Sequence, residues 1–245
     1  MDGTDTGSDT GHESPQESFR ALLHAQRVWD TGGAPLPAFD PATAPDDPLT
    51  LFHRWFTQAV AADQPEPHTM TLATTDEQGR PDVRTLMLHD ADDHGWHFAS
   101  HATSRKGRHL AARPEAALGF YWPTQARAVR LRGPVRTAPP RASSADLHAR
   151  STGALASALV GRQSEVLASP EELAEASRTA WEQARRAPST EVPTWTAYIL
   201  VPDEVEFFQG EEHRRHVRLR YRHPASPSPG TSVRESAWVR ELLWP

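Results

Sequence analysis

The sequence predicts a mainly β protein with inserted helices, folded as an antiparallel, Greek-key-like barrel. Short segments with strand-like alternation, separated by turn residues, occupy 69–136 and return after residue 195. Between these two groups, residues 143–186 have mostly helical periodicity. Several antiparallel strands with helices between them are typical of a barrel.

The chain divides into a tail, a connector and one large domain. Residues 1–16 are polar and lack the apolar content that offsets the entropy of ordering, so we expect a disordered tail. Residues 17–46 are expected to form a short helix, followed by a proline-rich connector that could wrap around a partner subunit. Residues 47–245 are expected to form the barrel domain, which opens with a helix capped by Asp47.

Within that domain the elements follow in order. The spacing predicts strands at 69–75, 83–89 and 96–100, which would form two hairpins in series and the start of a meander. Ser104 is the expected N-cap of a helix that Pro114 ends, and Ser169 caps a later one. The remaining strands are expected at 116–122, 127–136, 195–201, 205–209, 213–222 and 237–243, with a mobile Pro/Ser-rich loop before the last.

Composition excludes several classes of protein. With a net charge of -6, no overall positive field would attract nucleic acid or anionic lipid. The absence of cysteine excludes disulfides, thiolate nucleophiles and Cys-ligated metal centres. No apolar run approaches the roughly 18 residues that span a bilayer. We therefore expect a cytoplasmic protein with no nucleic-acid or membrane partner.

The segment Ser104-Arg105-Lys106-Gly107-Arg108 places cations and a hydroxyl at the start of a predicted helix. Backbone N–H groups and the helix dipole favour an anion there, so the segment is either a phosphate site or a solvated basic turn. Arg84 shares a strand face with Leu86 and Leu88, and therefore needs an anionic partner, which is either an internal carboxylate or a ligand phosphate.

Two further segments carry polar groups. A strand over 213–222 would align Arg214, His216, Arg218 and Arg220 on one face, as a binding surface or as a solvated edge. Gln163 and Ser164 either end a helix or donate to a ligand. His213 and His216 would point to opposite faces of such a strand, and we expect no metal site. The local signatures of hydrolases, P-loop enzymes and Rossmann folds are absent.

In this order, the segments resemble the pyridoxamine 5'-phosphate oxidase family from about Asp47 onward. The matching motifs are Asp47-Pro48-Leu49-Thr50-Leu51-Phe52, Ala73-Thr74-Thr75-Asp76 with Gly79 and Pro81, Arg84, Ser104-Arg105-Lys106, Arg127 with Val129 and Gly133, Gln163-Ser164, Glu206-Phe207 with Gln209-Gly210, Arg214 with His216 and Arg218, and the ending with Trp238 and Leu243 to Pro245.

The resemblance implies an FMN-binding split β-barrel that acts as a homodimer, with the cofactor held non-covalently between subunits. It implies FMN contacts by Arg84, Thr85, Leu86, Met87, Leu88, Ser100, Arg105, Lys106, Gln163, Ser164, Phe208 and Arg218. It assigns Arg84, Arg105 and Lys106 to one subunit's share of the site and Gln163, Ser164 and Arg218 to the other's. Two positions depart from the family, since Ala128 replaces a glutamine and Phe208 replaces a tryptophan.

The departures are sharper where the family binds its phosphorylated substrate. Arg150, Arg214 and His216 match, whereas His89 replaces a lysine, Asp146 a tyrosine and Ala154 a serine. A carboxylate beside a phosphate dianion repels it by about 1 kcal/mol or more. The segment Phe98-Ala99-Ser100-His101-Ala102 and Arg162-Gln163-Ser164-Glu165 more closely resemble the flavin oxidase of phenazine biosynthesis.

The leading hypothesis is an FMN-dependent oxidase that dehydrogenates a small reduced heteroaromatic acid, similar to a dihydrophenazine, and passes the electrons to O2 as hydrogen peroxide. Arg150 and Arg214 would bind the substrate carboxylate, and His216 or His89 would accept a proton. One alternative is a pyridoxamine 5'-phosphate oxidase with an altered pocket. Another is a flavin- or ligand-binding module without catalysis, which Ala128 favours.

Overall fold

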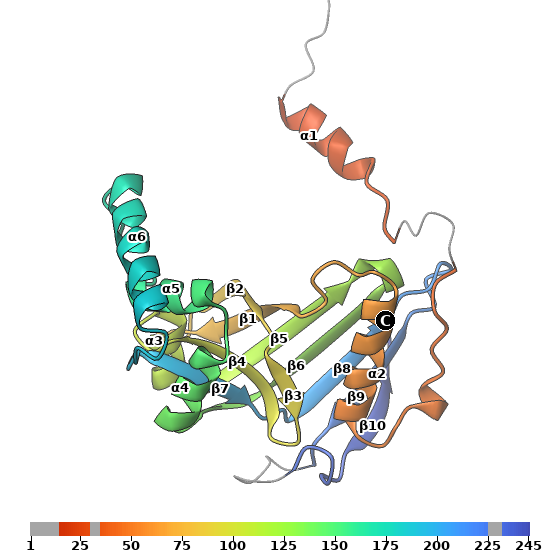
Figure 1. The fold of residues 1–245 in the computed structure, drawn as a ribbon. Coiled ribbons are helices and arrows are strands. Elements are labelled where there is room, and N and C mark those ends of the chain that lie inside the picture. Colours follow the sequence, from red (N-terminus) through yellow and green to blue (C-terminus); the bar gives the residue numbers. More distant parts are fainter. Residues whose placement is uncertain (1–14, 30–34, 225–231) are drawn as a thin grey trace, which may run out of the picture.

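The computed structural model describes residues 15–29, 35–224 and 232–245, and its centre is a strongly curved antiparallel sheet (Figure 1). The expected mobile loop before the last strand and nearly all of the expected disordered tail lie outside these residues. The described strands are β1 (Thr69–Thr75), β2 (Pro81–Met87), β3 (Asp90–Asp92), β4 (Gly95–His101), β5 (Glu115–Trp122), β6 (Arg127–Thr137), β7 (Trp195–Leu200), β8 (Glu204–Gln209), β9 (Val217–Arg222) and β10 (Val239–Leu243).

The long strand β6 divides the sheet into two branches. The main path runs β10-β9-β8-β6-β5-β1-β2, all antiparallel. Past residue 134, β6 leaves β8 and pairs with β7, which in turn pairs with β4. This fork produces the predicted antiparallel barrel with non-sequential strand order.

The predicted meander of two successive hairpins is wrong. Strands β1 and β2 form the first hairpin, but β4 pairs with β7, with Phe98 opposite Tyr198. The segment expected as an acidic turn contains the short strand β3, which pairs with β4. A partner about a hundred residues away in the sequence leaves no local signal, which is why the alternation pattern did not reveal this pairing.

The strand expected over 213–222 begins only at Val217. Arg214 has a left-handed backbone (φ 61°), and its N–H donates to the Glu211 carbonyl in a turn. Arg214 and His216 therefore precede the strand, and the predicted shared face with Arg218 and Arg220 does not form. The strand expected at 83–89 also ends early, at Met87.

The described helices are α1 (Pro15–His24), α2 (Pro48–Ala61), α3 (Arg105–Ala112), α4 (Pro140–His148), α5 (Thr152–Val160) and α6 (Pro170–Arg186), with short 3-10 turns at Pro41–Thr43 and Pro123–Gln125. The predicted N-caps are confirmed: Asp47, Ser104 and Ser169 each accept a backbone N–H of the first turn. No described helix is long and apolar enough to cross a membrane.

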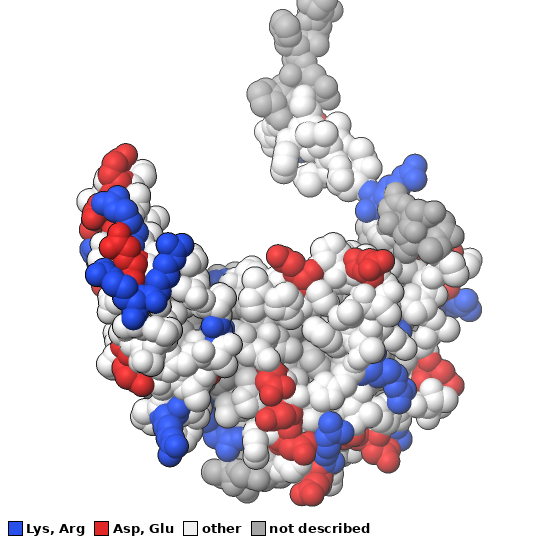
Figure 2. Space-filling view, in the orientation of Figure 1, with Lys and Arg blue, Asp and Glu red and all other residues white. Residues whose placement is uncertain are grey.

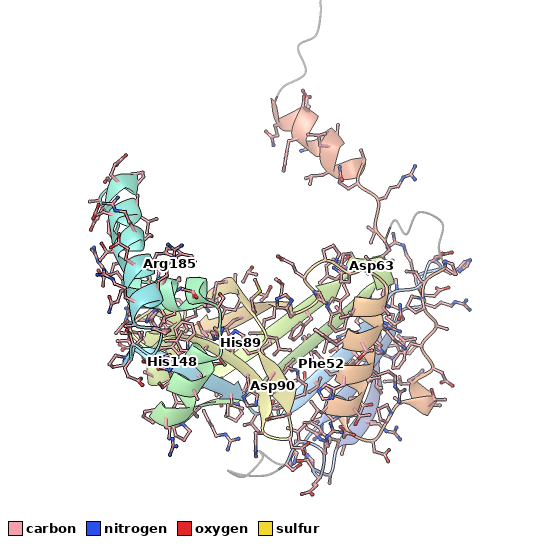
Figure 3. All side chains as sticks on the ribbon, in the orientation of Figure 1. Phe52, Asp63, His89, Asp90, His148 and Arg185 are labelled. Atoms are coloured by element: carbon pink, nitrogen blue, oxygen red, sulfur yellow. The ribbon has the colours of Figure 1, made fainter. Side chains whose placement is uncertain are left out.

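Helix α2 covers the sheet and completes the aromatic core (Figures 1 and 3). Phe52 packs edge-on against Trp96 at 5.4 Å, and Trp55 against Phe207 at 5.1 Å. Buried Arg127 lies 4.3 Å above the Trp55 ring and donates to three glutamine side chains. At the other end of the molecule α6 projects from the body and carries much of the visible charge, whereas the face between α6 and α2 is mostly uncharged (Figure 2).

Candidate functional site

A pocket of about 580 Å³ lies between β2, the end of β4 and helices α5 and α6. Thr85, Leu86 and Met87 of β2 line it, and Ser100 at the end of β4 lines it as well. Two groups of polar side chains each contribute some of their members to its lining. We call Ser100, Arg105, Lys106, Gln163 and Ser164 the α3 cluster, and His89, Asp146, Arg150 and Trp195 the Asp146 cluster.

The α3 cluster is built on a helix N-terminus held tightly against β4. The Ser104 hydroxyl accepts the Gly107 N–H and donates to the His101 carbonyl. A Cβ at Gly107 would come within 2.3 Å of the Ala102 carbonyl oxygen, so only glycine lets α3 lie this close to the chain that leaves β4. The Arg105 N–H donates to the Ser164 hydroxyl. The first turn of α3 therefore faces a polar, anion-favouring environment.

Lys106 is a buried cation whose partner is a neutral amide. Its Nζ donates to Gln163 Oε1 at 2.9 Å, and the Ser100 hydroxyl donates to the same oxygen at 3.0 Å. Burial and the nearby Arg84 guanidinium lower the pKa of Lys106 to about 8. A bound anion would relieve both effects, so the chemistry of this position fits a phosphate group.

Arg84 has the internal salt bridge that the sequence left as one alternative. Its Nη2 lies 2.7 Å from Asp82 Oδ2, and its Nη1 donates to the Thr74 hydroxyl. The exposed Arg105 guanidinium lies 3.9 Å from the same carboxylate. Both arginines are thus positioned beside Lys106. Asp82 contacts each of their guanidinium groups but does not surround either one.

The contacts of Gln163 and Ser164 bear on the predicted division of the site between subunits. Gln163 and Ser164, assigned to the second subunit, contact Ser100, Lys106 and Arg105 of their own chain. The loop after α5 returns to α3 because α5 and α6 pack against each other beside the pocket. The α3 cluster is therefore complete within one chain.

The Asp146 cluster is a network of hydrogen bonds around one ion pair, and Figure 3 labels His89 among its members. Asp146 Oδ1 accepts from Arg150 Nη2 at 2.8 Å, and Asp146 Oδ2 accepts from Arg150 Nε and from Trp195 Nε1, each at 3.0 Å. Arg150 Nη1 lies 2.7 Å from His89 Nε2, and Nη2 contacts His89 Nδ1. The Arg150 guanidinium also lies 5.2 Å from the centre of the Trp195 ring.

This cluster carries no net charge near neutral pH. Burial and Arg150 lower the pKa of His89 to about 4, so the imidazole is neutral and a weak base. Burial acts to raise the pKa of Asp146, but hydrogen bonds from Arg150 and Trp195 outweigh it and keep the pKa low. One carboxylate then balances one guanidinium. Among the described residues, no group of His, Cys, Asp or Glu is arranged to hold a metal ion.

Arg214 and His216 lie elsewhere, in a smaller pocket of about 280 Å³ lined also by Trp29. The His216 ring packs against Trp29 at 5.2 Å and Phe208 at 5.3 Å. His216 Nδ1 accepts the Glu211 N–H, so a neutral ring carries its proton on Nε2. A neutral His216 ring is therefore arranged to donate through Nε2, and the predicted role of His216 or His89 as proton acceptor stays a prediction.

Arg218 lies on β9, which is five strand positions from β2 and Arg84 along the main path of the sheet. The order β9-β8-β6-β5-β1-β2 contains five strand spacings, or roughly 24 Å along the sheet. Arg218 pairs with Glu206 at 2.8 Å and donates to the Trp244 carbonyl. With Ala128 and Phe208 it lines a separate pocket. The predicted site residues thus form two separate groups in one chain.

Sequence reasoning missed Trp195 and His101, which both line the main pocket. His101 bonds to Thr194 and packs against the Trp195 ring edge at 5.5 Å. Nothing in the local sequence links Trp195 to Asp146, because their contact depends on α4 packing against β7. Leu88, like Leu86, is partly buried against the core, and its predicted contact with the cofactor stays a prediction.

A split antiparallel barrel with a phosphate-type site beside a pocket of this size is typical of an FMN-binding class of flavoproteins. A family model described as "Pyridoxamine 5'-phosphate oxidase" matches residues 56–207, and a second, "Pyridoxine 5'-phosphate oxidase C-terminal dimerisation region", matches 195–245. The chain belongs to the pyridoxamine 5'-phosphate oxidase family and is an FMN-dependent oxidase.

The chain is similar to curated relatives and to a solved structure that carry different names. The chain is 41% identical over 207 residues to a pyridoxine/pyridoxamine 5'-phosphate oxidase of Pseudomonas fluorescens, covering 83% of this chain and 91% of the relative. A Burkholderia lata protein of that name is 40% identical, covering 80% and 91%. The structure of PhzG from Burkholderia lata 383, in complex with tetrahydrophenazine-1-carboxylic acid, superposes with a TM-score of 0.74 at 27% identity, covering 86% of this chain and 100% of that one.

The α3 cluster fits the FMN phosphate, and this fit predicts a pH dependence. Lys106 must be protonated to bind the dianion, and its pKa without a ligand is about 8. FMN affinity should therefore be nearly constant between the second pKa of the phosphate, about 6, and pH 8, and fall by up to tenfold per pH unit above pH 8, until the pKa of Lys106 in the bound state is reached. Titration of the FMN-free protein by fluorescence at pH 7, 8 and 9 measures this. Riboflavin, which lacks the phosphate, should show no such trend, and an equal trend for both would contradict the assignment.

Proposed function

We propose that this FMN-dependent oxidase dehydrogenates a small reduced heteroaromatic acid, similar to a dihydrophenazine carboxylate, in natural-product biosynthesis. Two electrons and two protons leave the substrate, O2 accepts them as hydrogen peroxide, and aromatisation of the product supplies driving force. The likeness to PhzG, whose solved complex contains a reduced phenazine acid, supports this substrate class.

The observation that carries the proposal is that Asp146 already neutralises Arg150. All three guanidinium nitrogens of Arg150 contact Asp146 or His89 within the chain. A phosphate dianion would have to displace the carboxylate or lie beside it, and charge repulsion disfavours the second arrangement. A pocket in which Arg150 is already paired with Asp146 suits a flat ring system without a phosphate better than a phosphorylated pyridine.

We further propose a homodimer in which the second chain completes the cofactor site. The C-terminal match to a dimerisation region supports the dimer. The α3 cluster would hold the phosphate, while Phe208 and Arg218 of the other subunit would contact the flavin ring. The roughly 24 Å between Arg84 and Arg218 along one sheet supports this division, with Gln163 and Ser164 moved to the phosphate side.

The chain's own residues would bind and orient the substrate. Hydride acceptance is the chemistry that FMN supplies when it is bound. Arg214, whose guanidinium has no partner among the described side chains, is the better-placed cation for the substrate carboxylate, and His216 Nε2 would donate beside it. Arg150, held by Asp146, is less available for this role than the sequence suggested. A cytoplasmic location completes the proposal.

The second candidate is oxidation of pyridoxine or pyridoxamine 5'-phosphate. The names of the relatives that are 40% to 41% identical favour it, as do the retained Arg150, Arg214 and His216.

Direct comparison of the two substrate classes tests the proposal. We expect peroxide release from an anaerobically prepared dihydrophenazine carboxylate, with kcat/KM at least about a hundredfold above that for pyridoxine 5'-phosphate, because two or more charged hydrogen bonds to phosphate are lost. Peroxide production and pyridoxal 5'-phosphate formation are the two measurements. Efficient turnover of pyridoxine 5'-phosphate would favour the second candidate instead.

A further inference from the structure

Trp195 belongs to the Asp146 cluster, yet it lies on a different element. It opens β7, while Asp146 lies on α4 and Arg150 just beyond it. Trp195 makes two kinds of contact there: its Nε1 donates to Asp146 Oδ2 at 3.0 Å, and its ring lies beneath the Arg150 guanidinium. The indole therefore touches both members of the ion pair.

The indole of Trp195 holds the Asp146 carboxylate in the position where it pairs with Arg150. Asp146 and Arg150 are four residues apart, and such a pair on a helix surface is mobile and weak when nothing else holds it. The two side chains are only 25% and 20% exposed, and the indole N–H, which comes from β7, donates to Asp146 Oδ2. Without that donor, Asp146 has rotamers that release Arg150.

We propose that Trp195 is a positioning residue that keeps Asp146 on Arg150, and that it thereby sets the preference of this pocket for an uncharged substrate edge over a phosphorylated one. The inference deepens the proposed function and rests on it for the identity of the natural substrate. The predicted preference against phosphate does not depend on which substrate is natural. The Asp146 cluster presents a neutral imidazole and carboxylate lone pairs to any ligand, and it contains no free cation.

The test compares ligands that differ only in the phosphate. Pyridoxal and pyridoxal 5'-phosphate are titrated into the FMN-loaded protein, and the ratio of their dissociation constants is measured by calorimetry. Asp146→Asn keeps an acceptor oxygen but removes the charge, so phosphate affinity should rise roughly tenfold while pyridoxal affinity stays constant. Trp195→Phe keeps the ring beneath Arg150 but removes the N–H, and should raise phosphate affinity about three- to fivefold.

The double variant shows whether Trp195 acts through Asp146. In the Asp146→Asn background, Trp195→Phe should change the ratio by less than about twofold, because the carboxylate it positions is gone. Trp181→Phe is the matched control, since Trp181 lines the same pocket but packs on Gly153 and Arg185 and not on Asp146. Its ratio should equal that of the wild type.

Two outcomes would overturn the inference: an unchanged ratio in Trp195→Phe, or equal effects of that substitution with and without Asp146. If either single variant fails to fold, the other still gives a ratio to compare with the wild type. Because these titrations do not use the reduced acid, a protein that shows the expected ratios but does not oxidise that acid would contradict the proposed function and leave the role of Trp195 intact.

Discussion

Replacing Arg105 and Lys106 together by alanine is expected to weaken FMN binding by about a hundredfold or more. The two side chains supply charge to one phosphate at the start of α3, and charge-assisted hydrogen bonds of buried groups contribute about 1.5 to 3 kcal/mol each. Lys106 is buried, so water replaces it poorly, whereas the exposed Arg105 contributes less. Fluorescence titration of the FMN-free protein measures the effect.

Arg108→Ala is the matched control for that experiment. Arg108 lies on the same helix and carries the same charge, but its guanidinium contacts the Thr103 carbonyl rather than the α3 cluster. It should leave FMN affinity within about twofold of the wild type. Riboflavin affinity should be insensitive to all three substitutions. Unchanged FMN affinity in the double variant would return residues 104–108 to the solvated-turn interpretation.

Restoring the family's residues in the substrate pocket is expected to raise activity on vitamin B6 phosphates. The variant His89→Lys, Asp146→Tyr, Ala154→Ser adds a cation and two hydroxyls and frees Arg150 from its carboxylate. Two regained hydrogen bonds to a charged group predict about a hundredfold higher kcat/KM for pyridoxine 5'-phosphate. Steady-state formation of pyridoxal 5'-phosphate is the measurement.

Ala154→Ser alone separates charge from hydroxyl effects in the same assay. It adds one hydroxyl beside the Ser151 cap of α5 and leaves Asp146 in place, so its gain should stay below about tenfold. A triple variant no more active than this single one would show that the Asp146 cluster does not control substrate choice.

Sequence alone predicted the local parts of the fold. Caps at Asp47, Ser104 and Ser169 were found because a cap is a contact within three residues, and strands β1 and β5 were found from their alternation. The pairing partners of the strands were not predicted, because the β4–β7 pairing joins residues that lie about a hundred positions apart in the sequence. The strand at 213–222 was overextended because nothing in its alternation shows that Arg214 adopts a left-handed backbone.

The candidate site shows the same difference between local features, which could be predicted, and contacts between distant elements, which could not. The local sequence offered Lys106, Arg105, Gln163 and Ser164 as possible ligand-binding residues, the family resemblance assigned them to one cofactor, and the structure brings them into contact. Residue identity alone suggested that Asp146 would repel phosphate. It did not show that Asp146 would also occupy Arg150, or that Trp195 would hold it there, because both depend on how α4 meets β7.

The two clusters of the main pocket sit on different pieces of the chain. The α3 cluster depends on the β4–α3 junction and the loop after α5, whereas the Asp146 cluster depends on α4, the start of β7 and the residue just past β2. Substitutions in the segments that carry the Asp146 cluster can therefore accumulate during evolution while the segments that carry the α3 cluster keep their geometry. Such an arrangement lets descendants of one ancestral enzyme diverge in the metabolites they oxidise without ever passing through a form that has lost its redox group.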